Sequence, residues 1–106
     1  MPQPDPSDVP DPTRLLGAWQ LVRADPGLDV PPRARLEFAP GGRLLYHVPV
    51  QQHWQTLTLI YRAEGTTLHL GVPMTAQERI ANFSFGPGGA LVFDFGGLRA
   101  IFIREL

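Results

Sequence analysis

Three histidines are the side chains best suited to metal or acid–base chemistry in this chain, because the sequence contains no cysteine. His47, His53 and His69 fall in stretches whose alternating apolar residues predict neighbouring β-strands. Alternation directs His53 to the inner face of a sheet, and His47 and His69 to the outer face. A metal needs ligands that converge on one point, so we expect no metal site and no cofactor.

Carboxylates are the other source of catalytic chemistry, and no pair of them faces a common interior. Glu37 and Asp94 both alternate to the outer face, and no serine occupies a nucleophile-elbow context. We therefore expect no catalytic residues. If the chain were an enzyme, such as a small barrel cyclase or isomerase, His53 and Tyr61 would be its acid–base pair.

Length and charge narrow the class of protein further. The 106 residues suffice for one domain, the net charge is −1, and the nine basic residues are arginines spread along the sequence. This distribution gives no basic patch for nucleic acid, and no apolar run reaches the ~18 residues of a membrane span. Residues 1–12 are rich in proline and lack a signal-peptide pattern. We predict an extended tail there, a folded domain over 13–106 and a cytoplasmic location.

Short alternating runs cut by glycine-containing turns position these side chains. They predict eight strands, at 18–23, 34–38, 43–50, 54–62, 67–72, 80–85, 91–95 and 98–104. Eight short antiparallel strands in sequence order favour an all-β, up-and-down β-barrel, because closure removes the exposed edges of a flat sheet. Short helical turns are expected before the first strand and around Thr75 and Glu78, which have capping-box spacing.

The two longest connections of this barrel, 24–33 and 73–78, leave the same end. Long loops on a rigid scaffold are common binding sites, so we predict the ligand site at that open end. An interior packed solid with Leu, Phe and Tyr side chains is the alternative. The residues expected to bind the ligand are Tyr46, Val48, Val50, Leu70, Val72, Phe83 and Phe95 as wall, Met74 as lid, and His53, Gln55 and Tyr61 as polar groups.

Trp19 lies two residues after Gly17 at the start of the first predicted strand, and Arg104 ends the last. Barrel closure makes these strands neighbours, so we expect the Arg104 guanidinium over the Trp19 indole, which would plug the bottom of the barrel. Gly17 would let the preceding helical turn pass close beneath the indole. This Gly-x-Trp, after a helical turn and with an arginine in the last strand, resembles the signature of the lipocalin/calycin superfamily. The segment LEFAPGGRLLY also resembles small bacterial lipocalin-like domains.

The resemblance implies a binding module that holds a small hydrophobic ligand at the open end of the barrel. The alternative is a protein-interaction module, because some bacterial protease inhibitors resemble this chain and use an extended N-terminal segment such as 1–12. Outward-facing Val92, Ile101 and Ile103 form an apolar patch suited to a homodimer. Trp54 either faces outward as a contact residue, or a one-residue slip of its strand turns it inward and His53 outward.

Overall fold

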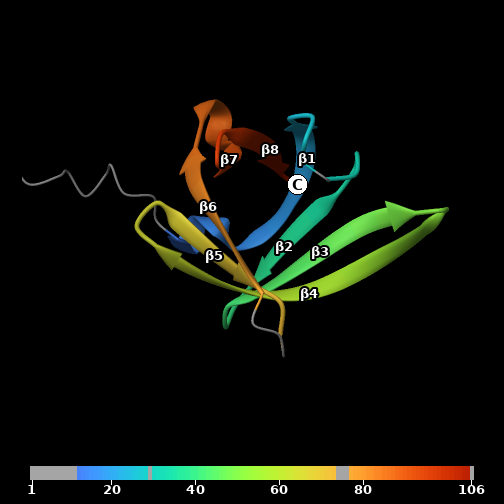
Figure 1. The fold of residues 1–106 in the computed structure, drawn as a ribbon, viewed down its shortest axis with the longest axis horizontal. Helices are drawn as coiled ribbons and strands as arrows, with labels where there is room; N and C mark the ends of the chain where they lie inside the picture. Colours follow the sequence, from blue (N-terminus) through green and yellow to red (C-terminus); the bar gives the residue numbers. More distant parts are fainter. Residues whose placement is uncertain (1–11, 29, 74–76, 106) are drawn as a thin grey trace, which may run out of the picture.

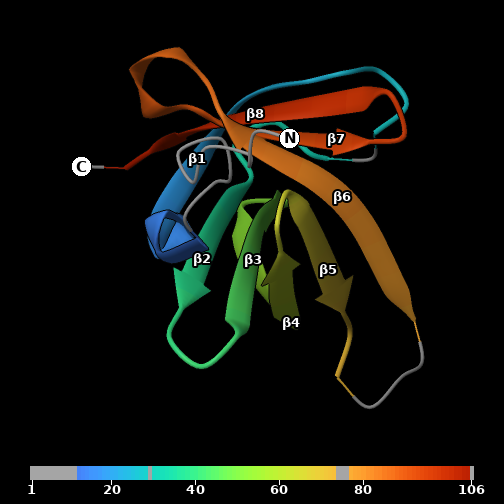
Figure 2. The same cartoon turned by 90° about the vertical axis from the view of Figure 1, so that its left-hand side faces the viewer.

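Eight antiparallel strands close into one barrel in sequence order (Figure 1, Figure 2). The computed structural model describes residues 12–28, 30–73 and 77–105. The strands are β1 (Gly17–Ala24), β2 (Arg35–Ala39), β3 (Arg43–Val50), β4 (His53–Glu64), β5 (Thr67–Gly71), β6 (Glu78–Phe85), β7 (Leu91–Phe95) and β8 (Leu98–Arg104). Two 3-10 turns, η2 (Pro12–Leu15) and η3 (Pro87–Gly89), accompany them. The predicted all-β barrel with a short N-terminal helical turn is confirmed.

The bounds of β3, β7 and β8 are those predicted, whereas β1, β4 and β6 are longer, β2 is shifted by one residue and β5 ends one residue earlier. β4 pairs with β3 from His53 to Ile60 and with β5 from Ile60 to Glu64, so its hydrogen bonds extend past the predicted end at 62. β6 begins at Glu78, opposite Gly71, two residues before the predicted start at 80. The predicted 1–12 tail lies outside the described residues, except for Pro12 in η2. Thr75 also lies outside them, and Glu78, which was expected in the same helical turn, instead begins strand β6.

The connections divide between the two ends of the barrel as the alternation of an up-and-down sheet requires. The first (25–34) and fifth (72–77) connections leave one end, here called the open end, and the turns at 40–42, 65–66 and 86–90 leave the closed end. The five-residue connection 86–90 keeps Phe85 opposite Leu91, so both side chains face inward. Its odd length is what keeps the Phe residues of both β6 and β7 inside.

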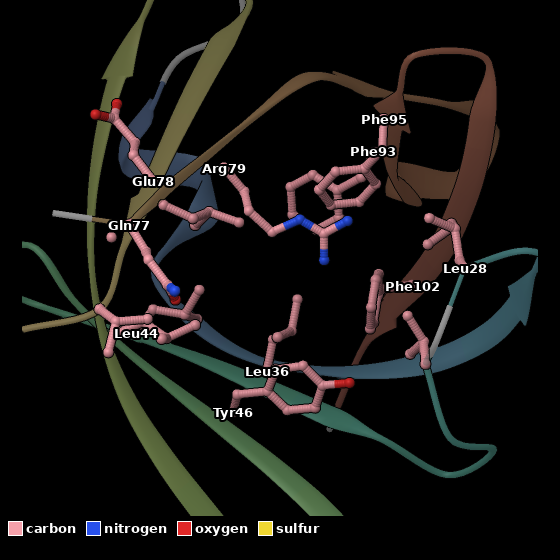
Figure 3. A pocket seen from close by; sticks show the side chains of 16 residues that line it. Leu28, Leu36, Leu44, Tyr46, Gln77, Glu78, Arg79, Phe93, Phe95 and Phe102 are labelled. Atoms are coloured by element: carbon pink, nitrogen blue, oxygen red, sulfur yellow. The ribbon is translucent and has the colours of Figure 1, made fainter. Parts of the chain in front are cut away.

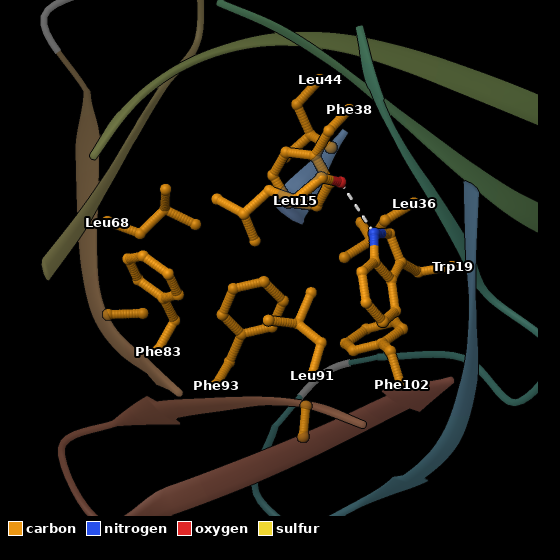
Figure 4. Packing of buried hydrophobic residues seen from close by; sticks show 12 residues of the cluster. Leu15, Trp19, Leu36, Phe38, Leu44, Leu68, Phe83, Leu91, Phe93 and Phe102 are labelled. Atoms are coloured by element: carbon orange, nitrogen blue, oxygen red, sulfur yellow. Dashed lines mark hydrogen bonds between the residues drawn. The ribbon is translucent and has the colours of Figure 1, made fainter. Parts of the chain in front are cut away.

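A hydrophobic core fills the half of the barrel near the closed end (Figure 4). Its members come from η2 and from every strand except β4, whose Leu59, Tyr61 and Ala63 pack against it and are partly buried. They are Leu15, Trp19, Leu36, Phe38, Leu44, Leu68, Ala81, Phe83, Leu91, Phe93, Ala100 and Phe102. Among the described residues, no polar or charged residue is buried. This core holds the strands in register beneath the open end.

Trp19 and Arg104 seal the closed end together. Trp19 is 1 % exposed, its indole N–H donates to the Leu15 carbonyl oxygen over 2.8 Å, and its Cα faces that of Arg104 across the β1–β8 pair. The Arg104 guanidinium lies 4.3 Å from the indole centre and donates to the carbonyl oxygens of Leu16 and Arg14. The predicted contact is confirmed.

Gly17 makes room for the Arg104 side chain, in addition to joining β1 to the helical turn that lies against the indole. A Cβ atom at Gly17 would come within 2.6 Å of Arg104 Nη1, and its φ of +114° is a conformation that L-residues avoid. The glycine therefore lets the Arg104 side chain cross beneath β1 to reach the carbonyl oxygens of Arg14 and Leu16.

The hairpin of β3 and β4 projects beyond the neighbouring strands at the open end (Figure 1). Pairing of Tyr46 with Leu57 places both side chains on the inner face, yet Leu57 is 54 % exposed. Trp54 pairs with Pro49 on the opposite, outer face, where the Arg33 guanidinium lies 5.7 Å from its ring centre. The register of β4 therefore has Trp54 outward, and the inner face of the hairpin tip has no opposite wall.

Candidate functional site

A cavity of about 610 Å³ occupies the open-end half of the barrel, above the core (Figure 3). Its wall combines strands from around the barrel with the first and fifth connections. The lining residues are Leu28, Val30, Leu36, Leu44, Tyr46, Leu59, Leu70, Gly71, Val72, Gln77, Glu78, Arg79, Phe93, Phe95, Ala100 and Phe102. The sequence left open whether the interior is packed solid or contains a cavity. The half of the barrel near the closed end is packed, and the half near the open end contains the cavity.

Aromatic rings from β7 and β8 form one side of this cavity. The Phe93 ring meets Phe102 edge-on with centroids 5.6 Å apart, and its centroid lies 6.1 Å from that of Phe95. Leucines of β2 to β5 form the opposite side. Because Phe93 and Phe102 also belong to the core, the floor of the cavity is rigidly supported from below.

Four residues predicted to bind a ligand do line the cavity: Tyr46, Leu70, Val72 and Phe95. Phe83 lies lower, inside the packed core, and Val48 is buried without lining the cavity. Met74, the predicted lid, lies outside the described residues.

Tyr61 also lies away from the cavity. Its ring packs edge-on against Phe38 with centroids 5.0 Å apart, and burial raises the pKa of its hydroxyl. The hydroxyl is therefore held in its neutral form well beyond neutral pH.

Val50, His53 and Gln55 lie on the inner face of the β3–β4 hairpin, as predicted, but the structure does not bring them to the cavity. All three are exposed, because the hairpin tip extends past the opposite wall. His53 and Tyr61 are eight residues apart on one strand, which separates them by roughly 26 Å at the usual rise of ~3.3 Å per residue. They form no acid–base pair.

The other two histidines lie on the outer face, in hydrogen bonds with neighbouring strands. His47 Nδ1 lies 2.7 Å from Thr56 Oγ1, and His69 Nδ1 lies 2.6 Å from Glu78 Oε1. Within the described ranges, no group of three or more His, Asp or Glu residues is arranged to hold a metal. Because it contacts His69 on the outer face, the Glu78 carboxylate points away from the cavity, although Glu78 is one of the lining residues (Figure 3).

Arg79 is the one cationic side chain among the described lining residues that the sequence interpretation missed. Ala81 and Phe83 are buried on the inner face of β6, so alternation puts Arg79 on the same face. Its guanidinium reaches into the cavity and lies 5.3 Å from the Phe95 ring centre (Figure 3). Counting back from Phe83 in steps of two would have found it, but the predicted strand began one residue later, at 80.

No family model, curated protein or solved structure matches this chain. Of the helical segments in the described residues, none has the length and hydrophobicity needed to cross a membrane. The geometry of the barrel and its cavity is therefore the basis for a functional conclusion.

Proposed function

We propose that this protein is a lipocalin-like binding module that holds a small hydrophobic ligand in the open-end cavity. The observation that carries the proposal is an apolar hollow of about 610 Å³ inside a closed barrel. Small-molecule sites are concave, mostly apolar and usually between ~300 and ~1,000 Å³. The floor of the cavity is shared with the core through Phe93 and Phe102, and the lining residues nearer the open end, such as Val30 and Val72, are outside that core.

The lipocalin-like character of the proposed module rests on the closed end. Gly17, Trp19 and Arg104 occupy the positions of the superfamily signature, and their contacts give each residue a physical role in closing the barrel. This arrangement supports the resemblance through structure as well as sequence.

A cavity-filling substitution tests ligand binding. Leu70→Trp places an indole in the cavity, and Ile80→Trp places the same group on the outer face of neighbouring β6, where Ile80 is 58 % exposed. The neutral fluorescent probe N-phenyl-1-naphthylamine should bind the wild type and the Ile80→Trp variant equally. Leu70→Trp should weaken that binding at least tenfold while circular dichroism stays unchanged. Absence of binding by the wild type, or equal binding by all three proteins, would contradict the proposal.

A protein-interaction function is the second candidate, because the projecting hairpin exposes large apolar side chains. Val50, Trp54, Leu57 and Ile60 are all exposed along β3 and β4, and exposed apolar groups of this kind mark contact surfaces. A double substitution of Trp54 and Leu57 by Ser should leave binding of the neutral probe intact. If the hairpin serves association, the same change should lower the sedimentation coefficient of the protein to that of a monomer.

A homodimer through Val92, Ile101 and Ile103 is a separate proposal. Ile103 is exposed, whereas Val92 and Ile101 are half-buried on adjacent positions of the β7–β8 pair. Sedimentation velocity of the Ile103→Glu variant tests this proposal. The variant should sediment as a monomer, and a variant that still sediments as a dimer would show that the patch is not the interface.

A further inference from the structure

We propose that the ligand is an apolar molecule with one acidic group, and that Arg79 pairs with that group at the mouth of the cavity. The inference rests on the proposed function, and it adds the chemical class of the ligand. Its basis is the position of Arg79 and the charges around that residue.

Arg79 is a cation placed against an apolar surface. It stands at the second position of β6, next to the fifth connection, with buried Ala81 and Phe83 following it on the same face. Its guanidinium lies over Phe95, at the open end of the cavity (Figure 3). Arg79 is exposed at the open end, and the apolar wall on one side of its guanidinium reduces the screening of its charge by water on that side.

Of the residues that the structure describes, the carboxylates nearest the open end are engaged elsewhere. Glu78 Oε1 lies 2.6 Å from His69 Nδ1, on the outer face. Asp94 accepts from the Gly97 N–H over 2.6 Å, and Asp25 accepts from the Arg99 N–H over 2.9 Å. Among the residues described by the structure, none forms an ion pair with Arg79.

Several other arginines of the barrel have an oxygen partner that explains their position. Arg35 pairs with Glu105, Arg62 with Glu64 and Arg99 with Asp94, while Arg104 donates to backbone carbonyls. Arg79 instead turns its planar donor array into a cavity that is otherwise apolar or neutral. A guanidinium matches the geometry of a carboxylate through two parallel hydrogen bonds.

The chemistry of the wall also fixes how the ligand lies. One cation at the rim and an apolar floor place the acidic group at the mouth and the hydrophobic body below it, between the Phe side and the Leu side. A single positive charge favours a single negative charge, because a second acidic group would be desolvated without a partner. The ligand class is therefore an apolar monoanion, either a short fatty acid or an aromatic acid.

Two fluorescent probes of nearly the same shape test this inference. 1-Anilinonaphthalene-8-sulfonate carries one acidic group, and N-phenyl-1-naphthylamine is the same body without it. Arg79→Gln removes the charge at the cavity, and Arg62→Gln removes one from an exposed outer position of β4, as a matched control. Arg79→Gln should weaken binding of the sulfonate ten- to a hundredfold, because charge-assisted hydrogen bonds are lost. Binding of the neutral probe should change less than twofold, and Arg62→Gln should change neither.

The outcomes separate the inference from the proposed function. If the wild type binds both probes and Arg79→Gln affects them equally, the acidic ligand class is wrong and the hydrophobic site stands. If the wild type binds neither probe, both proposals fail. Titration with decanoate and 2-naphthylacetate, each against the matching alcohol, then distinguishes an acyl from an aromatic ligand. Preference for either acid that is lost in Arg79→Gln supports the inference, and equal affinity for acid and alcohol overturns it.

Discussion

The guanidinium of Arg104 lies 4.3 Å from the centre of the Trp19 indole, where the last strand pairs with the first. This contact joins the two ends of the sheet and caps the core at the end opposite the cavity. Since Trp19 also donates to the Leu15 carbonyl oxygen, one side chain ties β1, β8 and η2 together.

Replacing Trp19 with Ala should lower the free energy of unfolding by ~3–5 kcal/mol, as large aromatic truncations in cores do. Trp54, which is 48 % exposed, provides the matched control: Trp54→Ala should cost less than ~1 kcal/mol. Urea denaturation followed by far-ultraviolet circular dichroism measures both changes. A Trp19→Ala variant nearly as stable as the wild type would refute the role of this residue in sealing the barrel.

Gly17→Ala should destabilise the barrel by ~1–3 kcal/mol, because it adds a Cβ near Arg104 Nη1 and keeps a positive φ. In an Arg104→Ala background the clash is gone and the backbone strain remains. The cost of Gly17→Ala should therefore be smaller there, yet above zero. A double-mutant cycle by urea denaturation measures the coupling, and identical costs in both backgrounds would mean that Arg104 does not occupy this space.

Leu44 and Leu57 lie on the same face of the β3–β4 hairpin with opposite exposure, 1 % and 54 %. Leu44→Ala should cost ~2–5 kcal/mol, and Leu57→Ala less than ~1 kcal/mol. Thermal denaturation compares the two variants. Similar losses would show that the tip of the hairpin folds back onto the barrel instead of projecting from it.

Stability should fall in alkali partly because of Tyr61. Burial raises the pKa of its hydroxyl above the ordinary value of 10.0, so the folded state holds the proton more tightly than the unfolded chain. This stabilisation is present in full below about pH 10 and is lost as the pH rises through the folded-state pKa. As the pH rises above about 10, the free energy of unfolding should decline more steeply for the wild type than for Tyr61→Phe. Equal pH dependence of the free energy of unfolding in the two proteins would contradict a raised pKa for Tyr61 in the folded state.

The turn between β3 and β4 should accept a stabilising change. Gln51 and Gln52 have φ angles of +47° and +71°, the pattern of a hairpin turn that Asn-Gly favours. Replacing the pair with Asn-Gly should raise stability by ~1 kcal/mol, because the strain of two left-handed glutamines is relieved. Differential scanning calorimetry would register the gain as a higher Tm. A lower Tm would mean that the glutamine side chains stabilise the turn.

The fold could be predicted well because the barrel uses strong local signals. Short, mostly apolar runs in β3, β7 and β8, each bounded by turn residues, reproduced their bounds. Closure of an eight-stranded barrel predicts that Arg104 neighbours Trp19, and the two residues do pair across β1 and β8. Residues far apart in the chain were correctly paired because strand order alone determines the neighbours of an up-and-down barrel.

The candidate site was harder to predict because it depends on how far each strand extends towards the open end of the barrel. Alternation predicted the correct face for His53 and Gln55, but it does not report how far a hairpin extends beyond its neighbours. Arg79 was missed because a charged residue at a strand start resembles part of the loop. Strand ends depend on long-range pairing, here between Gly71 and Glu78, and that pairing leaves no local signal.

The division of the interior into a packed lower half and a hollow upper half has an evolutionary consequence. Substitutions among rim residues such as Leu28, Val30 and Val72, which are not among the buried core residues, can alter the shape and charge of the cavity while leaving the core intact. Natural variants of this barrel should therefore diversify fastest at the mouth, and one scaffold can acquire new ligand preferences without first losing its ability to fold.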